Sequence, residues 1–184
     1  EAYLHYQKGQ ELLLRSSGTK EDMEKAIRYF EISIREDSTF SKAWVGLGDA
    51  YTEAIFWHRL PYDMAIPKAK EAVMKALALD PELGEGYGLL GAIAYVERDF
   101  KEGETYLRKA IAYSPNHTFA YERLAWIMYM QGHVEEAFRL LYKTIELDPL
   151  STRNKGSIGN AYAFSGRYDE GIKVLEEFLK SDPT

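Results

Sequence analysis

The sequence contains no cysteine among its 184 residues. This absence excludes disulfide bonds, zinc sites built on cysteine and catalysis by a thiol, and it leaves the redox compartment undecided. An excess of basic residues is also missing, because 23 lysines and arginines stand against 29 aspartates and glutamates, for a formal net charge of −6. Nucleic-acid-binding domains commonly carry a basic footprint, so this balance predicts that nucleic acid is not a partner.

Long hydrophobic runs are absent as well. The longest, residues 124–130, is far shorter than the ~20 apolar residues that cross a bilayer, so we expect no direct membrane insertion. No secretory leader is visible and the chain begins at Glu1 rather than Met, which leads us to expect a processed product or a piece of a longer protein. We expect a soluble segment, with the cytoplasm favoured over the periplasm.

Proline is scarce, yet its placement is regular. Four of the six prolines follow one another at intervals of 34 residues: Pro81, Pro115, Pro149 and Pro183. Glycine keeps the same period at two places in the unit: Gly91 and Gly159, and Gly103 and Gly171. A fixed period of this length is the signature of a repeat architecture, in which each unit packs on the next.

Each period contains two helical patterns. Apolar residues recur at intervals of three and four through residues 120–128, are interrupted at Gly132 and His133, and recur again through residues 135–147. Pro149 then ends the second pattern, because proline lacks the backbone donor and disfavours helix in the residue before it. Each unit is therefore predicted to form two helices, which approach each other closely at the small residues.

These residues resemble the tetratricopeptide repeat (TPR) family, whose pattern is an aromatic residue, Leu-Gly, Tyr, a later Ala, an aromatic residue and a closing proline. The best match is Ala43-Trp44-Val45-Gly46-Leu47-Gly48-Asp49-Ala50-Tyr51, which closes at Asp80-Pro81. The resemblance covers nearly the whole chain and implies an all-α fold, a right-handed superhelical solenoid of five helix-turn-helix TPR units with about ten helices. It implies a single TPR domain over residues 1–184, with repeats at about residues 2–39, 40–82, 83–116, 117–150 and 151–184.

Two insertions depart from the family pattern. The first unit carries about five extra residues at 15–19, and the second carries about nine between Tyr51 and Ala69. Both lie between the two helices of a unit, so we expect them to project from one edge of the solenoid. Residues 60–70 are similar to the TPR regions of bacterial signalling proteins, among them membrane-spanning transcription regulators and adenylate cyclases.

Motifs for chemistry are weak. Gly86-Tyr87-Gly88-Leu89-Leu90-Gly91 fits the dinucleotide fingerprint, but that motif works only between a strand and a helix, and residues 72–79 have helical spacing. We therefore expect no cofactor. The four histidines lack metal-ligand spacing, so we expect no metal, and we place His117 and His133 at helix boundaries. No carboxylate pair is arranged for acid–base catalysis, and we expect no enzymatic activity.

The first helix of each unit lines the concave face of this fold, where ligands usually bind. The aromatic column at Trp44 faces the core, so at about 100° per residue the second, fifth, ninth, twelfth and thirteenth places of each unit face the other way. In the third and fourth units these places hold Tyr95, Phe119, Trp126, Tyr129 and Met130. Two interpretations are open. The aromatic side chains bind a ligand, or tight curvature buries them against the neighbouring first helices.

The candidate peptide-binding residues on this face are Asp49, Tyr95, Phe119, Glu122, Trp126, Tyr129, Met130, Arg153 and Asn160. We expect an aromatic shelf with Glu122 and Glu85 at an acidic rim. Chaperone-binding members of the family hold a peptide carboxylate with Lys and Asn, and only Asn160, beside Arg153, resembles part of that clamp. The secondary candidate is the edge loop with Trp57, His58 and Tyr62.

The sequence therefore predicts a non-catalytic scaffold module that binds a protein or peptide in the concave groove, within a larger bacterial signalling or regulatory protein. The alternative is self-association through exposed solenoid ends, which would give a weak homo-oligomer. Repeat arrays normally end in a polar capping element, and the last helix instead carries apolar residues: Val174, Leu175, Phe178 and Leu179.

Overall fold

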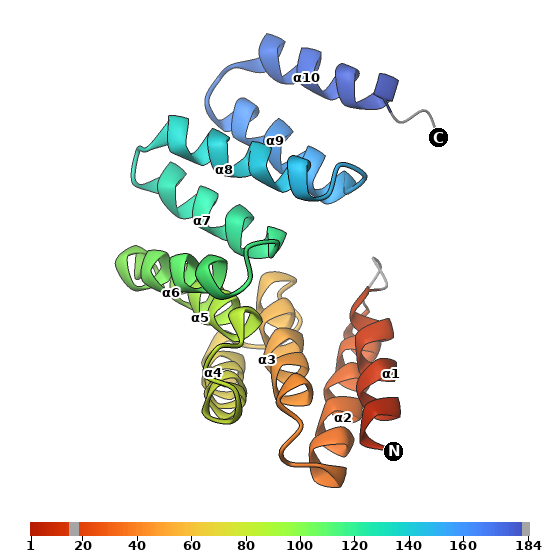
Figure 1. Cartoon of the computed structure of the whole chain (residues 1–184). Helices are drawn as coiled ribbons and strands as arrows, with labels where there is room; N and C mark the ends of the chain where they lie inside the picture. Colours follow the sequence, from red (N-terminus) through yellow and green to blue (C-terminus); the bar gives the residue numbers. More distant parts are fainter. Residues whose placement is uncertain (15–18, 182–184) are drawn as a thin grey trace. The chain divides into compact units, whose positions relative to one another are not determined.

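The computed structural model describes residues 1–14 and 19–181, which form ten α-helices and no strand. The first insertion falls mainly on residues 15–18, which lie outside the described residues. The all-α class and the helix-turn-helix units are confirmed (Figure 1). The helices are α1 (Ala2–Leu14), α2 (Lys20–Glu36), α3 (Ser41–Phe56), α4 (Tyr62–Leu79), α5 (Gly84–Val96), α6 (Phe100–Tyr113), α7 (Thr118–Met130), α8 (Val134–Leu147), α9 (Thr152–Phe164) and α10 (Tyr168–Ser181).

Side-chain caps begin several of these helices. Thr19 Oγ1 accepts a hydrogen bond of 3.1 Å from the backbone N–H of Asp22 at the start of α2. Asp99 caps α6 and Ser151 caps α9 in the same way, at 3.0 and 3.2 Å. The periodic prolines follow the C-terminal caps of α4, α6 and α8, because a proline cannot continue the helical hydrogen bonds.

By contacts between residues, the chain forms two compact units, Glu1–Ser114 and Pro115–Thr184. In the first, α1 packs on α2, α3 on α4 and α5 on α6, with α2 on α3 and α4 on α5 between the hairpins. In the second, α7 packs on α8, α8 on α9, and α9 on α10. The single-domain assignment and the repeat boundaries stay predictions. Each unit has its own core, with Phe30 and Ile93 fully buried in the first and Leu124 and Ile158 in the second.

Small residues allow the helices of a hairpin to approach closely, as the sequence predicted. A Cβ built on Gly9 would lie 2.8 Å from the ring of Phe30, and one on Gly159 would lie 3.0 Å from Leu175 Cδ1. A Cβ on Gly91 would overlap the side chain of Leu107. The glycine places of the repeat are therefore filled by a large side chain from the partner helix.

The turn between the two helices of a hairpin repeats the same geometry. Residues 98, 132 and 166, again 34 apart, have positive φ values of 64°, 85° and 70°. The next residue in each case donates its N–H to a carbonyl five residues back, for example His133 to Met128 at 2.8 Å, which is the Schellman arrangement. Gly132 and Gly166 occupy two of these places, whereas the first is occupied by Arg98.

The second insertion is mostly helical. Helix α3 has 16 residues, against 13 in α5, α7 and α9, and α4 has 18, against 14 in α6, α8 and α10. Both helices of the second hairpin are thus extended, and residues 57–61 connect them. His58, with a φ of 52°, lies at the start of this connection.

Candidate functional site

The predicted inner face of α7 lies against α9 in the second unit. Glu122 of α7 contacts Ser157 of α9, and Trp126 contacts Phe164 near the other end of both helices. These two contacts join residues 35 and 38 positions apart in the sequence, so successive first helices are neighbours. Glu122 and Trp126, which the helical periodicity placed on one side of α7, both face the next first helix, and the binding role of this side stays a prediction.

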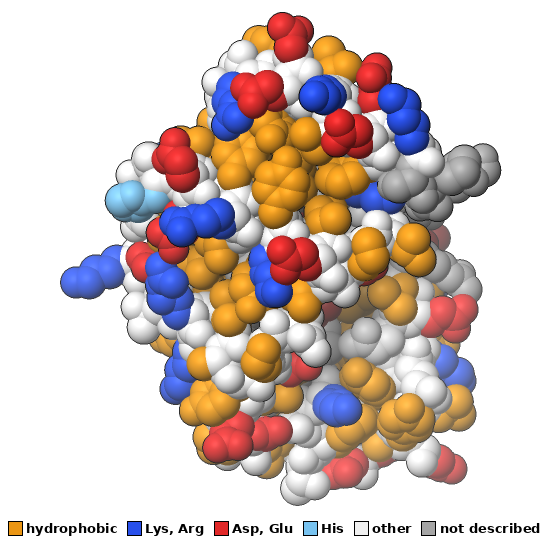
Figure 2. All heavy atoms as spheres, turned by 45° about the horizontal axis from the view of Figure 1, so that its top comes forward, with side chains coloured by type: hydrophobic (Ala, Val, Ile, Leu, Met, Phe, Trp, Pro, Cys, Tyr) orange, Lys and Arg blue, Asp and Glu red, His pale blue; other side chains and the backbone are white. Residues whose placement is uncertain are grey.

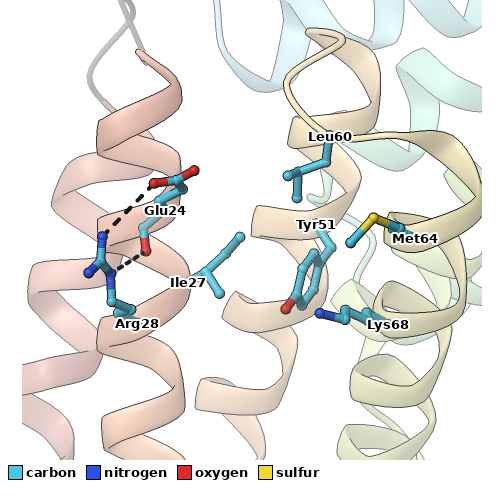
Figure 3. Close-up of a pocket in the computed structure, with 7 residues that line it drawn as sticks. All are labelled: Glu24, Ile27, Arg28, Tyr51, Leu60, Met64 and Lys68. Carbon is cyan, nitrogen blue, oxygen red and sulfur yellow. Dashed lines mark hydrogen bonds and ion pairs between the residues drawn. The ribbon is translucent and has the colours of Figure 1, made fainter.

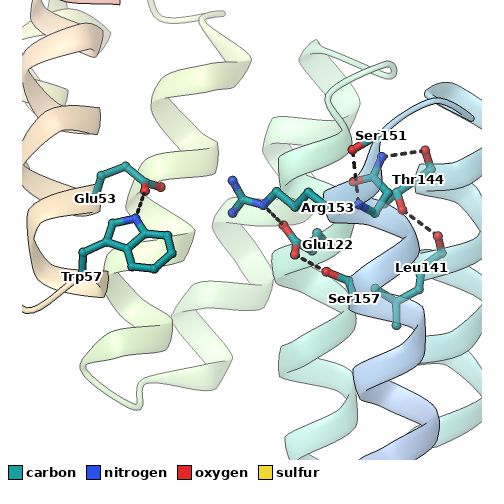
Figure 4. A network of polar contacts seen from close by, with 9 residues as sticks. Glu53, Trp57, Glu122, Leu141, Thr144, Ser151, Arg153 and Ser157 are labelled. Carbon is teal, nitrogen blue, oxygen red and sulfur yellow. Dashed lines mark hydrogen bonds and ion pairs between the residues drawn. The ribbon is translucent and has the colours of Figure 1, made fainter. Parts of the chain in front are cut away.

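The polar part of this face centres on a buried carboxylate. Only 6% of Glu122 is exposed, and its Oε1 accepts a hydrogen bond of 2.6 Å from Ser157 Oγ. Its Oε2 lies 3.3 Å from Nε of Arg153, whose side chain remains 54% exposed (Figure 4). The expectation that Glu122 forms an exposed acidic rim was wrong, because Ser157 and Arg153 on the next first helix cover it and balance its charge. Glu85, in the first unit, is exposed.

The start of α9 is fixed by a second polar group. Asn154 is buried, and its Nδ2 donates a hydrogen bond of 3.1 Å to the carbonyl oxygen of Thr144 in α8. Thr144 Oγ1 in turn donates to the carbonyl of Leu141 at 2.7 Å. These contacts, drawn in Figure 4, hold the helix that carries Arg153 and Ser157 in register with α8.

The aromatic part of the face lies at the other end of α7 and α9. Trp126 makes edge-on contacts with Tyr129 and Phe164, at ring-centre distances of 5.9 and 6.0 Å. The Tyr129 hydroxyl accepts a hydrogen bond of 3.4 Å from Ser165 Oγ. Trp126 and Tyr129 are half-buried, while Met130 is 57% and Phe164 is 70% exposed. The rings thus pack in part on the neighbouring helix and still present a surface, while ligand binding by these side chains stays a prediction.

Phe119 lies at the polar end of the face, half-buried. The guanidinium groups of Arg123 and Arg153 lie 4.9 and 6.0 Å from its ring centre. Asn160 is exposed on α9, the helix that also carries Arg153. Because Arg153 already pairs with Glu122, the partial carboxylate clamp proposed from the sequence has its cation occupied.

Two predicted residues belong to the first unit. Asp49 is half-buried on α3, and Tyr95 is half-buried on α5 with its ring 6.0 Å from that of Phe100. Tyr6 of α1 lies close to the same face. Burial raises its pKa, and Tyr3, Glu85 and Asp49 raise it further. Tyr6 therefore lies near Tyr3 and near the carboxylates of Asp49 and Glu85. The shelf joining Tyr95 to the residues of α7 stays a prediction.

The edge-loop candidates are exposed and tied to neighbouring helices. Trp57 is 62% exposed, and its Nε1 donates a hydrogen bond of 2.8 Å to Glu53 of α3 (Figure 4). Tyr62 is 44% exposed and donates its hydroxyl to the carbonyl of Val96 at 3.3 Å. Burial raises the pKa of this tyrosine, and the nearby Glu97 raises it further. His58 is exposed beside them.

The glycine motif and the histidines, for which the sequence predicted no cofactor or metal site, have structural roles. Gly86 to Gly91 lie inside helix α5, and a Cβ on Gly86 would lie 2.9 Å from Leu77, so the segment is not the strand-to-helix loop of a dinucleotide site. His117 and His133 are the N-caps of α7 and α8, as predicted. Within residues 1–14 and 19–181, no three His, Asp or Glu side chains cluster in a way that could hold a metal ion. In the same part of the chain, no helix has the length and apolar character to span a bilayer.

Sequence reasoning missed Ser157 as a member of the face, and it placed Phe164 on the face without including it among the candidate binding residues. Both occupy positions that pair with α7 only after the two hairpins stack. The position of Phe164 on the inner face of the fifth unit could have identified it as a binding candidate. A small serine opposite a glutamate has no feature in the sequence that would identify it. Exposed apolar side chains also lie on α10, with Ile172 57% and Leu179 72% exposed. Figure 2 shows hydrophobic side chains gathered near the C-terminal end of the chain, bordered by charged ones.

Comparisons with known proteins agree with this architecture. Two tetratricopeptide repeat models match residues 89–152 and 153–184, which together make a little over half of the chain. No curated protein matches the chain significantly. Among solved structures, a thermophilic TPR protein of Thermus thermophilus is similar with a TM-score of 0.81 at 15% identity, over 100% of this chain and 93% of that one.

Two further structures are similar. MamA has a TM-score of 0.60 at 26% identity, over 88% of this chain and 89% of its own. YrrB, described as a TPR protein with an unusual peptide-binding site, has a TM-score of 0.55 at 21% identity, over 100% of this chain and 87% of its own. With its repeated helical hairpins and these family matches, the chain belongs to the tetratricopeptide repeat family, whose fold generally serves as a non-catalytic scaffold for protein interactions.

Proposed function

We propose that the chain binds a peptide segment of a partner protein on the inner face formed by α7 and α9. The observation that carries this proposal is the aromatic group of half-buried Trp126 and Tyr129 and exposed Phe164, with exposed Met130 next to Tyr129 in the sequence. Aromatic side chains that are rigid and partly desolvated are typical anchors of protein interfaces. The peptide-binding site in the name of the similar protein YrrB supports the same kind of ligand.

The electrostatics of the face favour an internal segment with apolar anchors. Glu122 and Arg153 balance each other 3.3 Å apart, so the aromatic surface beside them has little net charge. A free C-terminal carboxylate would have to compete with Glu122 for the guanidinium group. The proposed ligand is therefore an extended or helical stretch whose large apolar side chains pack on Trp126 and Tyr129.

The test begins with peptide display against the immobilised chain, followed by titration of a selected peptide. Trp126→Ala should lower the affinity about thirtyfold, as expected for an anchor residue worth about 2 kcal/mol. The control is Tyr168→Ala, which removes a 64% exposed ring at the start of α10 and should leave affinity unchanged. Thermal melts verify that each variant is folded. Unchanged affinity for both Trp126→Ala and Tyr129→Ala would rule out the inner face.

The wider setting is part of the proposal. The likeness of residues 60–70 to the TPR regions of bacterial signalling proteins supports a role as the docking module of such a protein. The sequence that flanks this segment in its gene tests this setting, since a kinase, cyclase or DNA-binding neighbour would support it and a metabolic enzyme would contradict it.

Self-association is the second candidate function, because Ile172 and Leu179 are exposed on α10. Sedimentation velocity over a wide range of protein concentrations tests it. A concentration-dependent dimer that disappears in Leu179→Glu would support it, whereas a monomer at all concentrations would reject it.

A further inference from the structure

The first unit contains an open pocket that the inner face does not use. It has a volume of about 390 Å³ and lies between α2 and α4, with α3 behind it (Figure 3). Its lining comes from three helices and the connection after α3: Glu24, Ile27, Arg28, Tyr51, Leu60, Met64 and Lys68. None of these residues belongs to the inner-face candidates, and a volume of this size is typical of a binding site.

The base of the pocket is apolar, and its mouth carries an adaptable side chain. Ile27 and Tyr51 are 8% and 6% exposed, so they form a fixed wall. Leu60 is half-buried and Met64 is 54% exposed, and both come from the second insertion. Methionine adapts its shape to different partners. The insertion therefore adds an adaptable apolar rim to a hairpin that would otherwise be an ordinary repeat.

The charged side chains at the mouth give the pocket a net positive charge. Lys68 points from α4 toward Tyr51, with its ammonium nitrogen 5.5 Å from the ring centre (Figure 3). Arg28 lies 4.0 Å from Glu24, and both side chains are well exposed, at 67% and 45%. An ion pair that long and that exposed contributes little and yields readily to a better partner. Two cations and one anion leave one net positive charge on a chain of net charge −6.

We propose that this pocket is a second docking surface, separate from the inner face, for a partner segment that places a large apolar side chain beside an acidic residue. The apolar side chain enters between Ile27 and Met64. The carboxylate meets Lys68 and Arg28, which turn to it at small cost because their own contacts are long and exposed. Lys68 lies 5.5 Å from the centre of the Tyr51 ring, and Arg28 makes a 4.0 Å ion pair and a 3.3 Å hydrogen bond from Nε to the backbone carbonyl of Glu24. Charge complementarity selects an acidic segment over a basic one.

The probe is a labelled amphipathic peptide in which leucines spaced three and four residues apart alternate with glutamates. Titration into the full chain with isotope-labelled methionine methyl groups gives a local readout. The Met64 methyl resonance should shift during the titration, while the resonance of Met74, 58% exposed farther along α4, stays in place. The same peptide with lysine for every glutamate should leave Met64 unmoved. Equal shifts with both peptides, or none at Met64 with the glutamate peptide, would overturn the proposal.

Two charge reversals on one helix provide the matched pair. Lys68→Glu should weaken binding of the glutamate peptide about fivefold, which corresponds to about 1 kcal/mol for an exposed charge contact. Lys75→Glu, also exposed on α4 and outside the pocket, makes the same change in net charge and should have a much smaller effect. Equal losses of affinity in both variants would show that the effect is long-range electrostatics, and they would refute the proposed binding in the pocket.

This pocket and the inner face are distinguished by one further variant. Trp126→Ala should leave the Met64 shift unchanged, because Met64 lines the pocket and reports on it alone. If Trp126→Ala abolishes binding while Lys68→Glu does not, the peptide occupies the inner face and the pocket proposal is wrong. Melting curves accompany each variant, and the methyl resonances outside the pocket verify that the fold is retained.

Discussion

The hydroxyl of Ser157 donates a 2.6 Å hydrogen bond to the buried carboxylate of Glu122, on the preceding first helix. Ser157→Ala would leave one carboxylate oxygen buried without this donor. Losing a partner of a buried charged group costs about 1–3 kcal/mol, so the free energy of unfolding should fall by that amount in urea denaturation. Thr105→Ala, at an exposed place on α6, is the control and should change stability by less than about 0.5 kcal/mol. A neutral Ser157→Ala would show that the two helices do not depend on this contact.

Much of the hairpin architecture was predictable because it depends on local signals. Proline stops, turn glycines and the period of three and four residues each act within one unit, so the two helices of the fourth hairpin, α7 and α8, followed from the sequence. The partner of Glu122 did not, because Ser157 lies 35 residues away and reaches it only through stacking of two hairpins. From the sequence alone, a glutamate on a helix is expected to be solvated, because its neighbours on other helices are not known.

The inserted residues show a second reason why the sequence alone did not predict the whole structure. An insertion between two helices reads as a loop, yet α3 and α4 are both longer than the first and second helices of the three hairpins that follow. The pattern of this segment permits helix on both sides of residues 57–61, and sequence alone does not say where each helix ends. Leu60 and Met64, which line the pocket of the first unit, come from this segment.

The close approach of α9 and α10 predicts opposite effects at two glycines of one helix. Gly159→Leu should destabilise the fold by about 1–3 kcal/mol through overpacking, because even a Cβ there lies 3.0 Å from Leu175. Gly156→Ala meets nothing within 4 Å and should stabilise by up to about 1 kcal/mol, since alanine favours helix. Chemical denaturation measures both. Ala125→Leu, at a fully buried place, should resemble Gly159→Leu. Loss of stability in Gly156→Ala would show that this part of α9 is not an open helical surface.

Arg98 occupies a backbone conformation that two glycines occupy elsewhere. Its φ is 64°, against 85° for Gly132 and 70° for Gly166 at the same place of the next units. A side chain at positive φ is strained, so Arg98→Gly should raise the melting temperature, by a stabilisation of about 1 kcal/mol. The converse change, Gly132→Ala, should lower it by a similar amount. Equal melting temperatures for Arg98→Gly and the unmodified chain would mean that the turn tolerates arginine without strain.

The glycine motif of α5 predicts the absence of nucleotide binding. A dinucleotide fingerprint needs glycines in a loop, where backbone N–H groups meet the pyrophosphate at a helix N-terminus. Gly86 to Gly91 instead lie within α5, where the backbone donors are committed to the helix and the spaces of Gly86 and Gly91 are occupied by Leu77 and Leu107. Calorimetric titration with millimolar NAD, ATP and cyclic nucleotides should therefore give no heat above dilution. Gly86→Ala, which crowds Leu77 without touching any phosphate site, should alter stability and leave this result unchanged. A micromolar dissociation constant that Gly86→Ala abolishes in a folded chain would refute the scaffold interpretation of this helix.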